Sequence, residues 1–210
     1  MKLDKTVILL SALLVGNSFG AAGIFGTYIN ITSTNFSSGS AVWYDAQAPG
    51  GTRASNPTDF QGFDFGAYNP SAGGALSLTG AEVLTFKNGN DDVAGASILY
   101  RVYSSAPPSF SNINAGFTAD QPFSDAATTN YSGAGDQKWS NGVGTTDLLA
   151  GLSAGSYLLE AYFQAETSTG LVFSNNAGSN FIARFSVVPE PTSALLATVG
   201  ALALLRRRRI

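Results

Sequence analysis

The clearest pattern in the chain is an alternation of apolar and polar side chains over residues 157–166. The odd positions are apolar or aromatic and three of the even ones are Glu or Gln, as in a strand that buries one face. Residues 181–187 repeat the alternation, with Phe181, Ala183, Phe185 and Val187 on one side. If the two strands are antiparallel neighbours, Glu160 and Arg184 are expected to face each other on the exposed side, in an ion pair that contributes about 0.2–1 kcal/mol.

Further segments carry weaker strand signals. Residues 97–105 predict a third strand, rich in β-forming residues on both faces, and residues 74–80 and 81–91 predict a fourth and a fifth, with Asn88-Gly89 as a turn into the third. Less marked candidates lie nearer the start, at residues 23–32, 40–45 and 60–68. No helical period lasts about ten residues outside the two ends. The pattern predicts an all-β domain, an antiparallel β-sandwich or jelly roll.

One local motif refines this prediction. Residues 152–157 read Leu-Ser-Ala-Gly-Ser-Tyr, which resembles the L-x-x-G-x-Y of tyrosine corners in immunoglobulin-like sandwiches. The resemblance implies that the Tyr157 hydroxyl bonds a backbone group a few residues upstream. The alternative is a core tyrosine with some other partner.

The first 22 residues have the order of a secretory signal peptide. Lys2 and Lys5 form a short basic region, residues 6–15 are mainly apolar, and small residues follow. We expect a signal helix over residues 1–20, with cleavage near Gly20, Ala21 or Ala22. The alternative is a buried N-terminal helix.

The last 23 residues form a second targeting pattern. Pro189-Glu190-Pro191 precedes an apolar run, expected to be a transmembrane helix over residues 192–205, and then the basic tail Arg206, Arg207, Arg208 and Arg209. The uncharged stretch from Ser193 to Leu205 spans about 20 Å as a helix, short of the roughly 30 Å of a hydrocarbon core, so a self-sufficient anchor is not expected. The arginines would stay cytoplasmic, because basic residues resist transfer across the membrane.

These three parts resemble the PEP-CTERM sorting signal of bacterial surface proteins. The resemblance rests on Val188, Pro189, Glu190 and Pro191, the apolar run and the arginine cluster. It implies export through the secretion translocon, trimming by signal peptidase, transient membrane retention, and removal of the tail by exosortase, a membrane-embedded cysteine protease. The product would be released or attached at the cell surface, often in extracellular polysaccharide. A plain C-terminal anchor is the alternative.

The remaining domain, residues 21–188, has its own resemblance and charge. Residues 82–103, 135–139 and 148–165 resemble an uncharacterised β-rich domain of bacterial secreted proteins, which implies no activity. The domain holds five cationic and twelve acidic side chains, a net charge of −7. Because phosphates need Lys and Arg, this charge argues against nucleic acid as a partner.

The composition removes several kinds of chemistry. The chain has no cysteine and no histidine, which excludes thiolate nucleophiles, Cys/His zinc sites and a Ser-His-Asp triad. Residues 88–92 read Asn-Gly-Asn-Asp-Asp and could bind calcium, but they lack the spacing of a calcium loop, so a solvated turn is the better interpretation. A calcium site would need Asp45, Asp59 or Asp64 to converge on this turn.

Three function classes remain. The leading one is a non-catalytic structural or matrix protein of the cell surface, with no cofactor and no metal. The second is a carbohydrate-binding module in which Trp43, Tyr44, Tyr68 and Trp139 stack on sugars, although core packing is the commoner role of such residues. The third is a glycoside hydrolase, for which no marked carboxylate pair is found.

Overall fold

The computed structural model describes residues 21–37, 40–47, 57–88, 90–119, 135–142 and 144–190. The expected signal helix, the expected transmembrane helix and the arginine tail lie outside these residues. Within the described part of the chain, no helix is long and apolar enough to cross a membrane.

The described residues form an all-β fold, which confirms that prediction. The strands are β1 (Gly23–Ser33), β2 (Val42–Asp45), β3 (Asp64–Tyr68), β4 (Leu76–Phe86), β5 (Val93–Tyr103), β6 (Ser111–Ala119), β7 (Asp136–Asn141), β8 (Thr146–Asp147), β9 (Gly155–Thr167), β10 (Gly170–Ser174) and β11 (Phe181–Val187). Two short 3₁₀ turns, Pro70–Ala72 and Asn176–Gly178, complete the regular structure.

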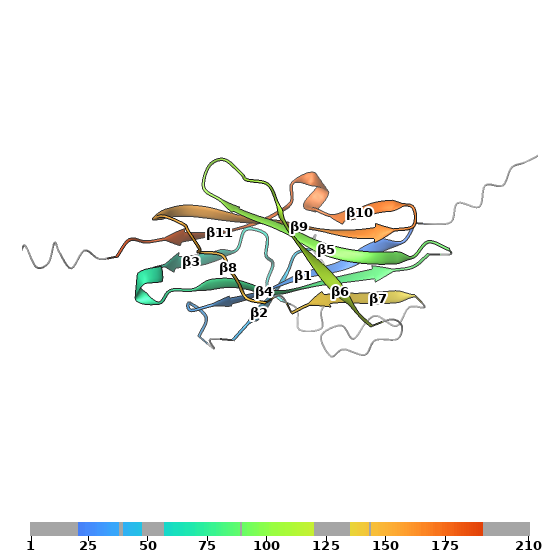
Figure 1. Cartoon of the computed structure of the whole chain (residues 1–210), viewed down its shortest axis with the longest axis horizontal. Helices are drawn as coiled ribbons and strands as arrows, with labels where there is room; N and C mark the ends of the chain where they lie inside the picture. The colour runs from blue at the N-terminus through green and yellow to red at the C-terminus, as the bar shows by residue number, and fades with distance from the viewer. Residues whose placement is uncertain are drawn as a thin grey trace, which may run out of the picture.

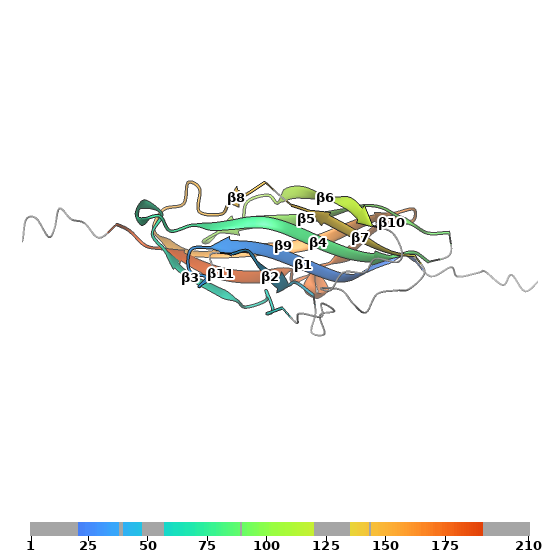
Figure 2. The ribbon, with the colours of Figure 1, turned by 90° about the horizontal axis from the view of Figure 1, so that it is seen from below.

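The strands belong to one continuous curled sheet in the order β2-β1-β4-β7-β6-β5-β9-β11-β3, with β8 beside β4 and β10 beside β9. All described pairings are antiparallel except that of β11 with β3. The first part of β6, residues 111–115, pairs with β5, and its second part, residues 116–119, pairs with β7, so β6 links the two halves of the sheet (Figures 1 and 2).

The two ends of the sheet are joined by the residues that precede β3. The Asp45 amide of β2 donates to Thr58 O at 2.9 Å, and the Phe60 amide donates back to Asp45 O at 2.7 Å. Further along, the Gly62 amide donates to Ile182 O of β11 at 2.7 Å. Residues 58–63 therefore act as a closing segment, which bonds β2 at one end of the sheet and β11, the neighbour of β3, at the other end, so that β2 is not left as an open edge.

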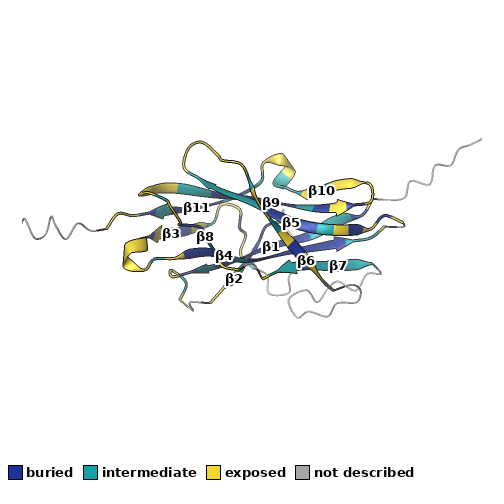
Figure 3. Cartoon of the chain, in the orientation of Figure 1, coloured by how far each residue is buried: buried dark blue, intermediate teal, exposed yellow. Residues whose placement is uncertain are grey.

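The core lies inside this curl and is supplied by both halves of the sheet (Figure 3). The alternation expected for residues 157–166 and 181–187 is confirmed, because the inward positions are buried: Leu159, Ala161, Phe163, Ala165, Phe181, Ala183, Phe185 and Val187. Burial of these side chains is the main favourable term that holds the two halves together.

Strands β9 and β11 are antiparallel neighbours, as expected, but the predicted ion pair between Glu160 and Arg184 is wrong. Glu160 lies opposite Ile182, and Arg184 lies opposite Leu158, two residues away. The alternation fixes which face a residue occupies but not the register between strands, so a shift by two keeps the same burial with different partners.

A second correction concerns residues 74–91. They were expected to form two strands, yet β4 runs unbroken from Leu76 to Phe86. The register with β1 slips where Asn30 pairs with Gly80 and Ile31 with Leu78, so Thr79 is an extra residue in the ladder. Gly80 thus marks a bulge inside one strand rather than the end of a strand.

The tyrosine-corner contact is present. Tyr157 Oη donates to Ser153 O, four residues upstream, at 2.8 Å. The ring of Tyr157 stacks on Phe185 with centroids 5.6 Å apart. The resemblance of residues 152–157 therefore predicted the partner of this hydroxyl correctly.

Candidate functional site

The acidic turn between β4 and β5 is hydrogen-bonded to Ala22, at the start of the described chain. Asp91 Oδ2 accepts hydrogen bonds from the Ala22 amide at 2.8 Å and from Thr169 Oγ1 at 3.1 Å, and Asp91 Oδ1 accepts one from Ser168 Oγ at 2.6 Å. The hydrogen bonds from Ser168, then from the Ala22 amide and Thr169, lower the pKa of this carboxyl below its usual value.

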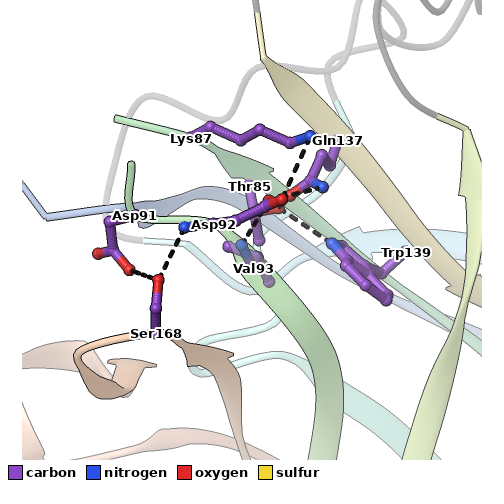
Figure 4. A network of polar contacts seen from close by, with 8 residues as sticks. All are labelled: Thr85, Lys87, Asp91, Asp92, Val93, Gln137, Trp139 and Ser168. Carbon is purple, nitrogen blue, oxygen red and sulfur yellow. Dashed lines mark hydrogen bonds and ion pairs between the residues drawn. The ribbon is translucent and has the colours of Figure 1, made fainter. Parts of the chain in front are cut away.

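Asp92 points to the other side of the turn (Figure 4). Its Oδ1 accepts from Gln137 Nε2 at 3.1 Å and from the Val93 amide at 2.8 Å, and its Oδ2 lies 3.4 Å from Lys87 Nζ. Both carboxylates of the turn therefore bind groups of the protein itself.

The three other aspartates that a calcium site would need are placed elsewhere. Asp45 and Asp59 meet through a backbone bridge at the closing segment, and Asp64 forms an ion pair with Arg184, with Oδ2 at 2.9 Å from Nε. In the described ranges, no three acidic side chains come together as a metal site would require.

The four aromatic residues singled out from the sequence do not form an exposed platform. Tyr44, Tyr68 and Trp139 are buried, and the half-buried Trp43 packs against Tyr28 and Leu84. Burial, together with nearby Tyr68, raises the pKa of Tyr44 to about 12. For the three buried residues, the alternative of core packing describes the structure.

A different aromatic row lies on the outer face of the sheet, on β9, β10 and the residue that precedes β6. The rings of Phe110 and Tyr162 meet edge to face at 4.9 Å, and Tyr162 is 6.2 Å from Phe173. Phe173 and its neighbour Leu171 are 50% and 53% exposed. We call Phe110, Tyr162, Phe173 and Leu171 the outer apolar row. The only sequence signal for it is Tyr162, an aromatic residue on the polar side of the β9 alternation.

A shallow groove of about 370 Å³ adjoins this row. Its polar lining comes from neighbouring strands: Ser97 of β5 lies opposite both Asn114 of β6 and Gln164 of β9, and Glu166 lies two pairs along, opposite Gly95. Ser97 Oγ donates to Asn114 Oδ1 at 3.0 Å. Phe117 stands edge-on to Trp139 at 5.1 Å on the other side of the groove.

A larger groove, of about 490 Å³, lies near the end of β11. Its one acidic side chain among the described residues is Asp64, which is already paired with Arg184. Hydrolysis of a glycosidic bond by two carboxylates would need a second acid there.

The segment that leads to the predicted sorting motif leaves the fold at this same end of the molecule. Strand β11 ends at Val187, the Val188 amide donates to Tyr68 O at 2.8 Å, and Val188 is 39% exposed. Pro189 and Glu190 are exposed. Strand β1 begins at the opposite end of the long axis (Figure 1).

No protein-family model matches the chain, and no curated protein matches it. Among solved structures, the chain is similar to the CooA pilin subunit from enterotoxigenic Escherichia coli. The similarity covers 65% of this chain and 96% of that chain, at 13% sequence identity and a TM-score of 0.27.

Proposed function

We propose that this chain is an exported bacterial cell-surface or extracellular-matrix protein with a non-catalytic structural or interaction β domain. Its C-terminal segment is a PEP-CTERM-type sorting signal that holds the protein in the membrane until exosortase cuts it. The observation that carries this proposal is the exposure of Val188 to Glu190, directly after the last core residue, Val187. A membrane protease can reach a motif that begins where the sheet ends.

The chemistry of the segment supports the same role. Pro189 and Pro191 lack a backbone N–H and hold the chain extended, so the motif does not join a sheet or helix and stays accessible to a protease. The apolar run is short, and the four arginines beyond it resist transfer and are attracted to the anionic inner leaflet by about 1 kcal/mol each. Together they halt export with the motif at the outer face.

At the level of the fold, the proposal includes an immunoglobulin-like sandwich arrangement of the curled sheet. The hydrogen bond from Tyr157 to Ser153 O supports it, since this contact is typical of such sandwiches. The tyrosine corner also lies on β9, the strand that pairs with β5, β10 and β11.

Two variants, each with several substitutions, separate the role of the four arginines from that of the Pro-Glu-Pro motif. Replacing Arg206, Arg207, Arg208 and Arg209 with serine is expected to release uncut precursor or to misplace it. Replacing Pro189, Glu190 and Pro191 with alanine is expected to leave uncut protein in the membrane. Mass spectrometry of the native surface protein decides: a C-terminus between Val188 and Pro191 supports processing, whereas an intact Ile210 on the surface form rejects it in favour of a permanent anchor.

A carbohydrate-binding module is the second candidate, favoured by the outer apolar row beside a groove lined with amides and a hydroxyl. Aromatic rings stack on sugar faces, and amide groups bond sugar hydroxyls. A glycan array tests it: binding that Tyr162→Ala and Phe173→Ala each weaken tenfold or more, with Arg184→Gln unaffected, supports the module. If the protein binds no glycan on the array, the carbohydrate-binding module is rejected and the structural role stands.

A further inference from the structure

The fold distinguishes two candidate signal-peptide cuts, after Gly20 and after Ala22. Cleavage after Gly20 places small residues, Ser18 and Gly20, at the two positions that signal peptidase reads, and cleavage after Ala22 places Gly20 and Ala22 there. The residues in question, Ala21 and Ala22, are the first two that the structure describes.

Ala22 is built into the folded domain, whereas Ala21 is not. Ala22 is 2% exposed and belongs to the main core cluster, and its amide donates to Asp91 Oδ2 at 2.8 Å. Ala21 is exposed. A cut after Ala22 would remove both the buried methyl group and one of the donors to Asp91.

The Asp91 carboxylate is arranged to receive this part of the chain. It is 6% exposed and takes its other hydrogen bonds from Ser168 and Thr169 in the β9–β10 turn, so it ties the start of β1 to a distant hairpin. The next residue, Gly23, already pairs with Phe86, whose ring would lie 2.7 Å from any Cβ at that position. Gly23 therefore has its own place in the ladder and carries no methyl group that could replace that of Ala22.

We propose that signal peptidase cuts this chain between Gly20 and Ala21, and that Asp91 holds the new N-terminus against the domain. The proposal rests on the export proposed above. Cleavage hydrolyses the peptide bond, leaving a carboxylate on Gly20 and an α-ammonium on Ala21. That nitrogen is one residue from the Ala22 nitrogen, hence within about 6 Å of the Asp91 carboxylate, close enough for the two opposite charges to attract.

Intact-mass measurement and N-terminal sequencing of the exported protein, made from the full-length precursor, test the cut directly. The expected first residue is Ala21. A first residue of Gly23, or any other cleaved N-terminus, overturns the inference while leaving export standing. An intact Met1 on the mature protein overturns both the inference and the proposed export, so the two failures are distinguishable.

Two precursor variants test the role of Ala22. Ser18→Leu puts a large residue where a cut after Gly20 needs a small one and redirects cleavage to follow Ala22, whereas Phe19→Leu lies between the two restricted positions. Both changes are lost with the signal peptide. The shorter product is expected to unfold at least about 3 °C below the product of Phe19→Leu. Equal thermal unfolding midpoints for the two products would contradict the proposed role of Ala22 in the stability of the domain.

A third variant gives a result even if Ser18→Leu blocks cleavage. Asp91→Asn places an NH₂ donor among the donors Ala22, Ser168 and Thr169, and is expected to lower the midpoint of the mature protein by at least about 3 °C. Asp59→Asn is the matched control, because Asp59 is exposed. An effect of Asp91→Asn no larger than that of the control contradicts the proposed role of Asp91.

Discussion

At the scale of single residues, Glu160 shows that strand alternation predicts which face of the sheet a side chain occupies but not whether that side chain is exposed. The pattern correctly assigns its side chain to the face of β9 away from the core, yet the residue is 4% exposed. Arg101 covers it through Nε and Nη2, at 2.9 and 2.8 Å, and Asn180 Nδ2 donates at 2.6 Å. The guanidinium in turn lies over the ring of Phe110, 4.1 Å from its centroid. The alternation in β9 could not predict that Glu160 is buried, because the residues that cover it, Arg101 and Asn180, lie 59 and 20 positions away in the chain.

Glu160→Gln is expected to lower the free energy of unfolding by about 2–3 kcal/mol, since it leaves a partly buried guanidinium without its counter-charge. Arg184→Gln breaks an ion pair of the same chemistry whose side chains are 65% and 51% exposed, and is expected to cost less than about 1 kcal/mol. Urea unfolding of the two variants measures both. Equal losses would show that burial does not govern the strength of these pairs.

The same carboxyl makes the stability of the protein depend on pH. Burial by itself would raise the pKa of Glu160, but hydrogen bonds from Asn180, Tyr103 and Arg101 and the charge of Arg101 together lower it. A lowered pKa gives stability that is complete above the unfolded value of about 4.3 and is lost as the pH falls through the folded value. Thermal unfolding between about pH 7 and pH 2 should therefore show the wild type and Glu160→Gln converging at the acid end. A constant difference would contradict the lowered pKa.

At the scale of elements, β9 and β11, the two strands with the clearest alternation of apolar and polar residues in the sequence, were placed correctly. In contrast, β6, β7, β8 and β10 were missed. Strand β7 reads Asp-Gln-Lys-Trp-Ser-Asn, with one apolar side chain, and β6 reads mostly small and polar residues. Their place in the sheet depends on backbone ladders to β4 and β5, which leave no trace in side-chain periodicity.

The corner that begins β9 can be tested by removing a single oxygen. Tyr157→Phe keeps the stacking on Phe185 and deletes the bond to Ser153 O, with an expected loss of about 1 kcal/mol in the free energy of unfolding. Tyr162→Phe on the same strand is the control, since Tyr162 contributes its ring to the outer apolar row. Chemical denaturation of both variants should separate them; similar losses would mean that the corner bond adds nothing.

At the scale of the whole molecule, the closing segment was beyond the reach of the sequence. Residues 60–68 were expected to form one strand, but only Asp64 to Tyr68 do, while Phe60 to Phe63 join the ends of the sheet. The candidate site was likewise only half predictable. The sequence offered Trp43, Tyr44, Tyr68 and Trp139 as sugar contacts, but residue type does not tell an inward ring from an outward one, so the buried Tyr44, Tyr68 and Trp139 could not be separated from the half-exposed Phe173.

Phe60→Ala tests the closing segment. Phe60 is fully buried at 0% exposure, and its loss is expected to cost about 3–5 kcal/mol. Phe173→Ala removes the same group from a half-exposed position and is expected to cost less than about 1 kcal/mol. Calorimetry of the two variants makes the comparison. A small effect of Phe60→Ala would show that the sheet does not depend on being closed.

The placement of the start of β1 and the end of β11 at opposite ends of the long axis has a mechanical consequence. Strand β1 runs from Gly23 to Ser33, and Ser33 Oγ is hydrogen-bonded to Tyr68 Oη at 2.6 Å, beside the point where β11 ends. Tension between the two ends would act parallel to the strands and perpendicular to their ladder hydrogen bonds. Such a load shears the β1–β4 and β9–β11 ladders as whole units, instead of unzipping them one bond at a time. A domain pulled from both ends in this way would resist extension through many bonds that share the force.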